Sequence, residues 1–304
     1  MALSASWAGQ MTGRLVAGTG GVLLNVLMTK MVTDWFAGRE ISTAMAIFVN
    51  SWPAGLAVSL LVLPPIGAAY GVSAVYLAVT TLIALGTLAL AALYDAPTVV
   101  VAGAHARTSL DRKTAAAAIT AGMIWCLYNV GFAMIFSFGP SMLVERGWSV
   151  TAAGSTTSIV LWLAALSVPL GGFLADRSNR PDLVLVTGCV TFAMLLVLAS
   201  RTVEVIPTFV LLGMVCGLAA GPILSVPARV LEPGTRAVGM GLFYTVYYVG
   251  MMFGAAIGGR YATWAGTAGA AFDFGAAMLI ACTLFLWIFH RITETLPLPA
   301  RPLS

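Results

Sequence analysis

The chain has 304 residues, of which 60% are hydrophobic and 9% are charged, and its formal net charge is +4 at pH 7. An ordinary soluble domain carries roughly 25% charged residues, so this composition excludes a soluble fold. No nucleic-acid partner is expected, and the composition predicts an integral membrane protein.

Apolar stretches of about 18–28 residues separate the charged clusters. At 1.5 Å of rise per residue, such stretches cross a hydrocarbon core of about 30 Å as helices. Short alternating barrel strands are absent, so the predicted fold class is an all-α polytopic membrane protein. We predict nine spans, at about 12–32, 42–69, 73–94, 115–143, 150–175, 183–200, 205–228, 237–259 and 268–289.

Lysine and arginine are distributed unequally between alternate loops. One set of loops holds eleven of them, including those of 95–114, 171–182 and the C-terminal tail, and the other set holds four. The positive-inside rule therefore predicts that the first set, with the C-terminus, is cytoplasmic. With nine spans, the N-terminus would then lie outside.

Two charged loops repeat one order of charges, basic, acidic, basic. Lys30, Asp34 and Arg39 form the first, and Arg229, Glu232 and Arg236 form the second. Secondary transporters are often built from two such repeated halves. Six spans follow the polar stretch 95–114 but only three precede it, so we expect three further spans in a complete twelve-span protein, which would return its N-terminus to the cytoplasm.

Residues 172–180, GFLADRSNR, resemble the G-x-L-x-D-R-x-G-R signature between the eighth and ninth helices of the major facilitator superfamily. Asn179 replaces the usual glycine, and asparagine also tolerates a left-handed turn. Pro181 replaces a second basic residue. Residues 14–20, RLVAGTG, are similar to the R-x-x-x-G-x-G pattern of that superfamily's fourth helix.

This resemblance implies that the chain corresponds to helices four to twelve of a major facilitator-like transporter. Residues 1–94 would be helices four to six of the N-terminal half, 95–114 the cytoplasmic central loop, 115–291 the complete six-helix C-terminal half, and 292–304 a cytoplasmic tail. The DWFAGRE loop and the VNSWPAG helix look like bacterial members of the cyanate and nitrate type branches. That likeness places the protein in a bacterial inner membrane.

Asp176 lies at the C-terminal end of a predicted helix, where the macrodipole disfavours an acid by a few tenths of a kcal/mol. The resemblance implies that its loop packs near the cytoplasmic start of the fifth helix, in the N-terminal half, at about Ile41 to Ala44, whose free N–H groups are partly positive. Asp176 would then latch the two halves, with Arg177 and Arg180 pairing with acids or lipid phosphate and Gly172 completing the signature. The alternative is a basic loop that only sets topology.

Arg14 is a strong charge within the predicted span 12–32, and an arginine at the centre of a span costs roughly 2.5 kcal/mol or more. We expect it to face the transport cavity and to serve an anionic solute or a proton-coupling step. Gly18, one turn further on the same face, would let a neighbouring helix approach. The alternative is an arginine that reaches the headgroups at the outer interface.

Polar side chains that interrupt apolar spans are candidates for the wall of a substrate cavity. They are Asn25, Asn50, Tyr128, Asn129, Tyr244 and Tyr247. Each of them alone is equally compatible with a hydrogen bond between helices.

The sequence therefore predicts a secondary active transporter of a small solute, with an anion and a co-transported proton as options, surrounded by the lipid bilayer. A truncated, non-transporting fragment or a partner-dependent half is the first alternative. A membrane enzyme is disfavoured because no H-E-x-x-H, G-x-S-x-G or G-x-x-x-x-G-K motif occurs. No catalytic residue, cofactor or metal site is expected.

Overall fold

A computed structural model describes residues 6–36, 39–95 and 109–294. Every regular element in these ranges is helical. The elements are α1 (Trp7–Phe36), α2 (Ile41–Tyr70), α3 (Val72–Leu93), α5 (Arg112–Glu145), α6 (Val150–Ser178), α7 (Pro181–Arg201), α8 (Val205–Cys216), α9 (Ala220–Ser225), the 3₁₀ turn η1 (Pro227–Arg229), α10 (Arg236–Ala265) and α11 (Ala270–Thr293). The all-α fold class is thereby confirmed for the described residues.

Eight helices within the described ranges are long and apolar enough to cross a membrane. They coincide with eight of the nine predicted spans, with Val205–Arg229 counted as one. The remaining predicted span, 42–69, forms the helix α2 but is not among these eight candidate spans. The count of nine spans therefore stays a prediction. Most of the predicted central loop and tail, 96–108 and 295–304, lies outside the described residues.

The helix ends follow local sequence chemistry. The Asp111 carboxylate caps α5 by accepting hydrogen bonds from the backbone N–H groups of Lys113 and Thr114, both at 3.1 Å. The hydrogen bonds from Thr114 lower the pKa of the Asp111 carboxyl below its usual value. Asn179 ends α6 with φ 52°, which confirms the left-handed turn expected at this position of the signature.

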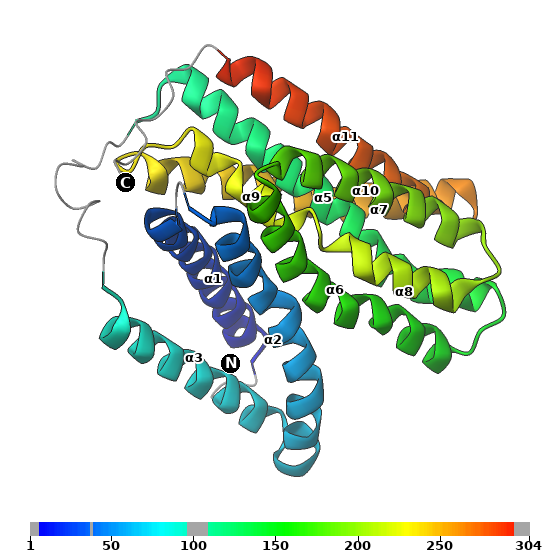
Figure 1. Cartoon of the computed structure of the whole chain (residues 1–304). Coiled ribbons are helices and arrows are strands. Elements are labelled where there is room, and N and C mark those ends of the chain that lie inside the picture. The colour runs from blue at the N-terminus through cyan, green and yellow to red at the C-terminus, as the bar shows by residue number, and fades with distance from the viewer. Residues whose placement is uncertain (1–5, 37–38, 96–108, 295–304) are drawn as a thin grey trace.

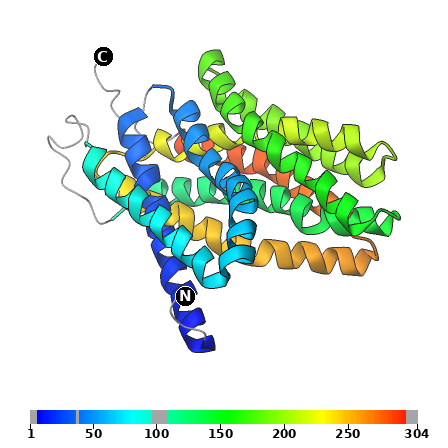
Figure 2. The same cartoon turned by 90° about the horizontal axis from the view of Figure 1, so that it is seen from below.

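The helices form two groups (Figure 1). The larger group, α5 to α11, is organised around α5, which packs against α10 and α11, while α6 packs against α8. The smaller group contacts the larger one through α2, which lies against α6 and α9, and through α1, which reaches α10 (Figure 2). Helix α3 contacts α2 near the turn that joins them and then runs away from it (Figure 1). The most apolar windows of α1 and α3 are almost entirely unburied by the other described helices.

The span predicted at 205–228 is broken rather than continuous. The α-helix stops at Cys216 and resumes at Ala220. Pro222 has no N–H to donate to the carbonyl of Leu218, and the Tyr128 hydroxyl donates to the carbonyl of Cys216 at 2.6 Å. On the other side of the break, the Ser167 hydroxyl accepts from the N–H of Gly217 at 3.1 Å. Side chains of neighbouring helices therefore satisfy backbone groups that the break would leave unpaired.

Glycines set the distances between helices in the larger group. The face of α10 that meets α5 carries Gly250, Gly254 and Gly258. A methyl group on Gly254 would come within 2.3 Å of Val130. The stripe is therefore a helix-packing surface, as close approach of two membrane helices requires.

We expect Gly171→Ala to destabilise the protein by about 1–3 kcal/mol, the usual cost of overpacking a close contact. The added methyl group would lie 2.1 Å from the carbonyl oxygen of Leu218, a backbone atom that cannot move alone. Gly18→Ala is the matched control, because nothing lies within 4 Å of its methyl group. Thermal unfolding of the full chain in detergent measures both, and equal midpoints for the two variants would contradict the packing argument.

Candidate transport site

The Asp176 carboxylate holds the first turn of α2. Its two oxygens accept hydrogen bonds from the backbone N–H groups of Ser42 at 3.2 Å and Thr43 at 2.6 Å. The N-cap residue of α2, Glu40, makes no side-chain capping hydrogen bond. Asp176 therefore caps α2 from a helix of the other group, where the partial positive charge of the helix start favours a carboxylate.

Gly172 allows this contact. A methyl group on Gly172 would lie 2.5 Å from the carbonyl oxygen of Ser42, and one on Gly221 of α9 would lie equally close to the same atom. Behind them, the Ser42 hydroxyl donates to the Ser225 hydroxyl at 3.3 Å. The start of α2 is thus enclosed by two glycines and bonded to α6 and α9.

Arg177 and Arg180 are exposed and form no ion pair with any described residue. Of the two partners expected for them, acids and lipid phosphate, no acid in the described ranges takes that role.

A buried ion pair joins the groups at the same end of the bundle. Arg236, the first residue of α10, lies 2.8 Å from an oxygen of Asp34 near the end of α1, and both side chains are less than 10% exposed. Lys30 lies 2.5 Å from the other oxygen of Asp34. The sequence singled out both charged loops but not their pairing. We call the end where Asp176, Asp34 and Arg236 lie the Asp176 end.

A second charged cluster at the Asp176 end was missed by the sequence reasoning. Asp182, at the start of α7, lies 2.6 Å from Arg229 and 3.0 Å from the imidazole of His290. Its three members come from α7, η1 and α11, so the cluster links three elements within the larger group. The sequence signal available was only the concentration of charge at these loop positions.

Further along the bundle, α1 meets a row of tyrosines on α10. The Asn25 amide donates to the Tyr248 hydroxyl at 2.9 Å, and the hydroxyls of Thr29 and Tyr244 are hydrogen-bonded at 2.7 Å. Tyr247 packs against Trp125 of α5, with ring centroids 6.0 Å apart. The structure thus brings together three of the predicted cavity residues, Asn25, Tyr244 and Tyr247.

The other predicted cavity residues have different surroundings. Tyr128 is buried, and its hydroxyl donates to the carbonyl of Cys216 at the break after α8. The Asn129 amide donates to the Trp125 carbonyl of its own helix at 2.8 Å. The side-chain oxygen of Asn50 is buried without a hydrogen-bond partner. Asn50 is therefore the one of these three with a buried polar atom that has no hydrogen-bond partner.

Arg14 is exposed and has no hydrogen bond or ion pair with any described residue. Nothing lies within 4 Å of a methyl group placed on Gly18. Arg14 and Asn25 are separated by about three helical turns, so they lie on one face of α1. The structure therefore places Arg14 on the face of α1 that meets the tyrosines, but beyond the point where α1 touches α10.

Among the described residues, no three His, Cys, Asp or Glu side chains gather in a way that could hold a metal ion. The four cysteines, Cys126, Cys189, Cys216 and Cys282, are all buried and unpaired.

Long apolar helices in two groups, joined by a capping carboxylate and a buried ion pair, define a polytopic helical membrane protein. The family model of the Major Facilitator Superfamily matches residues 121–302, which is more than half of the chain. The chain belongs to the major facilitator superfamily, whose members are membrane transporters of small solutes. A comparison with curated proteins found no match.

Proposed function

We propose that this chain is a secondary active transporter that moves a small anionic solute by alternating access. The observation that carries the proposal is the position of the polar contacts between the two groups of helices. They come from Asn25, Thr29, Asp34, Ser42 and Thr43 of the smaller group, and so they gather toward the Asp176 end. Contacts gathered toward one end suit a structure closed there, which opens when the groups rock apart.

In this proposal, residues 1–94 and 115–291 act as the two moving halves, joined by the central loop 95–114. The Asp176 end faces the cytoplasm of a bacterial inner membrane, as does the C-terminus. The excess of lysine and arginine in the loops at this end supports that orientation. Asp176 is the latch, and Arg177 and Arg180 contact lipid phosphate beside it.

The experiment that tests alternating access uses Ser42 and Ser225, whose hydroxyls are 3.3 Å apart across the interface. Both are replaced by cysteine in a chain whose four native cysteines are alanine, and the protein is reconstituted in vesicles. Solute-induced currents are screened over anionic and neutral solutes. Oxidation should stop the current by locking the Asp176 end, and a reductant should restore it. Currents that survive a quantitative crosslink would refute rocking, and no current with any solute would favour the non-transporting alternative.

Arg14 is proposed to bind the anion, because its charge is unpaired and lies on the same face of α1 as Asn25. We expect Arg14→Gln to raise the half-saturating solute concentration roughly tenfold or more, since a hydrogen bond to a charged group contributes about 1.5–3 kcal/mol. Arg14→Lys should keep part of the affinity.

The matched control is Arg260→Gln, which removes an exposed arginine near the end of α10. An equal loss in Arg14→Gln and Arg260→Gln, or none in either, would favour the interfacial alternative for Arg14. A changed pH dependence at unchanged affinity would instead assign Arg14 to proton coupling.

A further inference from the structure

A stripe of aromatic side chains runs along one face of α5. Its members are Trp125, Asn129, Phe132 and Phe136. Successive members are four, three and four positions apart, so they lie above one another on the same side of the helix. Phe132 is 8% exposed and Phe136 is 38% exposed. The stripe is therefore aromatic except for one amide, and its Phe136 end is accessible.

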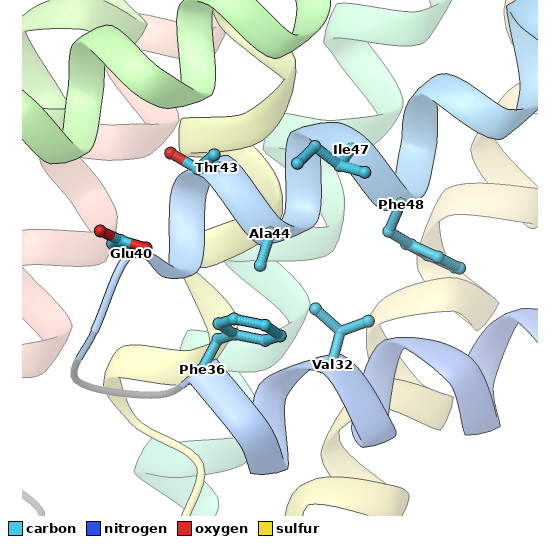
Figure 3. A pocket seen from close by; sticks show the side chains of 7 residues that line it. All are labelled: Val32, Phe36, Glu40, Thr43, Ala44, Ile47 and Phe48. Atoms are coloured by element: carbon cyan, nitrogen blue, oxygen red, sulfur yellow. The ribbon is translucent and has the colours of Figure 1, made fainter. Parts of the chain in front are cut away.

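Trp52 of α2 meets this stripe from the smaller group of helices. The centroid of its ring lies 6.4 Å from that of Phe132 and 6.3 Å from that of Phe136. One turn earlier on α2, Phe48 lies across from Val32 of α1 instead (Figure 3). Helix α2 thus faces α1 at Phe48 and reaches α5 at Trp52. We call Trp52, Phe132 and Phe136 the ring cluster, and its rings come from both groups of helices.

The ring cluster lies where rocking of the two groups would separate its members. Trp52 follows Ile41 by about three helical turns, so the cluster lies beyond the turn that is held at the Asp176 end. A flat ring that enters between two others needs about 7 Å, twice the contact distance of about 3.5 Å between carbon atoms. The present centroid distances of 6.3 and 6.4 Å are close to that spacing. A small displacement and a rotation of Trp52 would therefore admit such a ring.

Asn129 supplies one polar acceptor beside the ring cluster. Its amide N–H donates to the carbonyl of Trp125 at 2.8 Å, and within the described residues no group donates to its side-chain oxygen. Asn129 is half-buried and precedes Phe132 by three positions, about 4.5 Å along the helix axis. An amide oxygen has two lone pairs. The oxygen of Asn129 can therefore accept a hydrogen bond from a molecule that lies against the rings.

We propose that the solute is a small aromatic anion with a hydroxyl or amino group on its ring, held between Trp52 and the rings of Phe132 and Phe136. The hydroxyl or amino group donates to Asn129. This inference rests on the proposed function for the charge of the solute and for the motion that opens the cluster, and it adds the shape and polarity of the solute.

Two physical preferences follow from this geometry. An aromatic ring gains stacked or edge-to-face contacts with the three rings of the cluster, and a saturated ring of the same size does not. A solute without the donor leaves the oxygen of Asn129 unpaired, and sites that hydrogen-bond a hydroxyl discriminate against analogues that lack it. The ring and the donor are therefore separate requirements that can be tested one at a time.

Four carboxylates separate the two requirements: 4-hydroxybenzoate, benzoate, trans-4-hydroxycyclohexanecarboxylate and cyclohexanecarboxylate. Their binding to the purified full chain is measured by equilibrium dialysis, which does not depend on transport. We expect 4-hydroxybenzoate to bind about fivefold more tightly than its saturated counterpart, in line with contacts between aromatic rings. It should also bind about fivefold more tightly than benzoate, in line with one hydrogen bond.

Two variants assign these preferences to residues. Trp52→Leu should bring the ratio of aromatic to saturated acid close to one, and Trp52→Phe should keep part of it. Asn129→Leu should remove the preference for the hydroxyl and keep the preference for the aromatic ring. The controls are Trp162→Leu, which removes another exposed indole, and Thr187→Val, which removes another side chain bonded to the carbonyl four residues earlier in its own helix. Neither control should change either ratio, and gel filtration checks that each variant folds.

The unchanged protein decides the proposal even where a variant fails to fold. Equal binding of the aromatic and saturated acids, or no binding of any of the four, would overturn it. Preferences that survive in Trp52→Leu and Asn129→Leu, or that are lost equally in the controls, would do the same. The expected ratios in a protein that carries no current would support this site and reject transport. A current carried by an aliphatic anion, with no aromatic preference in binding, would reject this site and leave transport intact.

Discussion

Replacing Asp176 with asparagine is expected to shift the protein toward the conformation that is open at the Asp176 end, by roughly tenfold or more. The asparagine amide keeps only one of the two oxygens that accept from Ser42 and Thr43, and an NH₂ donor takes the place of the other. It also loses the negative charge that faces the partly positive start of α2. Asp176→Glu keeps the charge on a longer side chain and should lie between the two.

The measurement is the rate at which a maleimide labels Ser225→Cys in native membranes. Ser225 is 2% exposed and touches Ser42 across the interface, so its labelling reports separation of the two groups. The four native cysteines are buried, which keeps the background low, and they are replaced by alanine as a further safeguard.

Asp273→Asn is the control for this experiment. Asp273 is also a carboxylate with a bonded partner, since it pairs with Arg201 at 2.7 Å, but it lies at the other end of the bundle. Its replacement should leave the labelling rate of Ser225→Cys unchanged. If Asp176→Asn also leaves that rate unchanged, the latch role is wrong and the loop acts on topology alone.

Asp34→Asn is expected to lower the stability of the protein by about 3–5 kcal/mol, the usual cost of leaving one member of a buried ion pair without its partner. The Arg236 guanidinium is 8% exposed, so water does not replace the lost carboxylate. Lys30 would also lose its acidic neighbour. Thermal unfolding of the full chain in one detergent gives the change directly.

The pairing itself is tested by exchanging the charges. Asp34→Arg combined with Arg236→Asp should recover part of the stability that each replacement loses alone, and the difference is the coupling energy of the pair. The comparison variant is Arg291→Gln, because Arg291 and Glu294 form an exposed pair that contributes little. Asp34→Asn with no larger loss than Arg291→Gln would show that the Asp34–Arg236 contact is not maintained.

The helices and the left-handed turn at Asn179 were predictable because each depends on residues close by in the sequence. Long apolar stretches mark the spans whatever surrounds them, and Asn179 occupies a signature position whose turn requires a left-handed residue. The pairing of Asp34 with Arg236 joins residues 202 positions apart. The length of an apolar stretch does not say which helices become neighbours. Both charged residues could therefore be identified from the sequence, but their pairing could not.

Tyr128 shows the same limit from the other side. A tyrosine in an apolar span predicts either a cavity wall or a bond between helices, and the sequence left both open. The choice depends on the break after Cys216, whose free carbonyl takes the hydroxyl. Pro222 was the available signal for that break, because it withholds one hydrogen bond from the helix. The break that Pro222 favours lies several residues earlier in the chain, and the side chain that bonds there, Tyr128, comes from a different helix.

The capping of α2 by Asp176 has a consequence for biosynthesis. The carboxylate that caps Ser42 and Thr43 lies 134 and 133 residues further along the chain. A ribosome therefore releases α2 well before its cap exists, and the first turn of α2 must wait at the membrane surface, bonded to water, until α6 has been inserted. The order of translation thus leaves the joining of the two helix groups among the late steps of assembly.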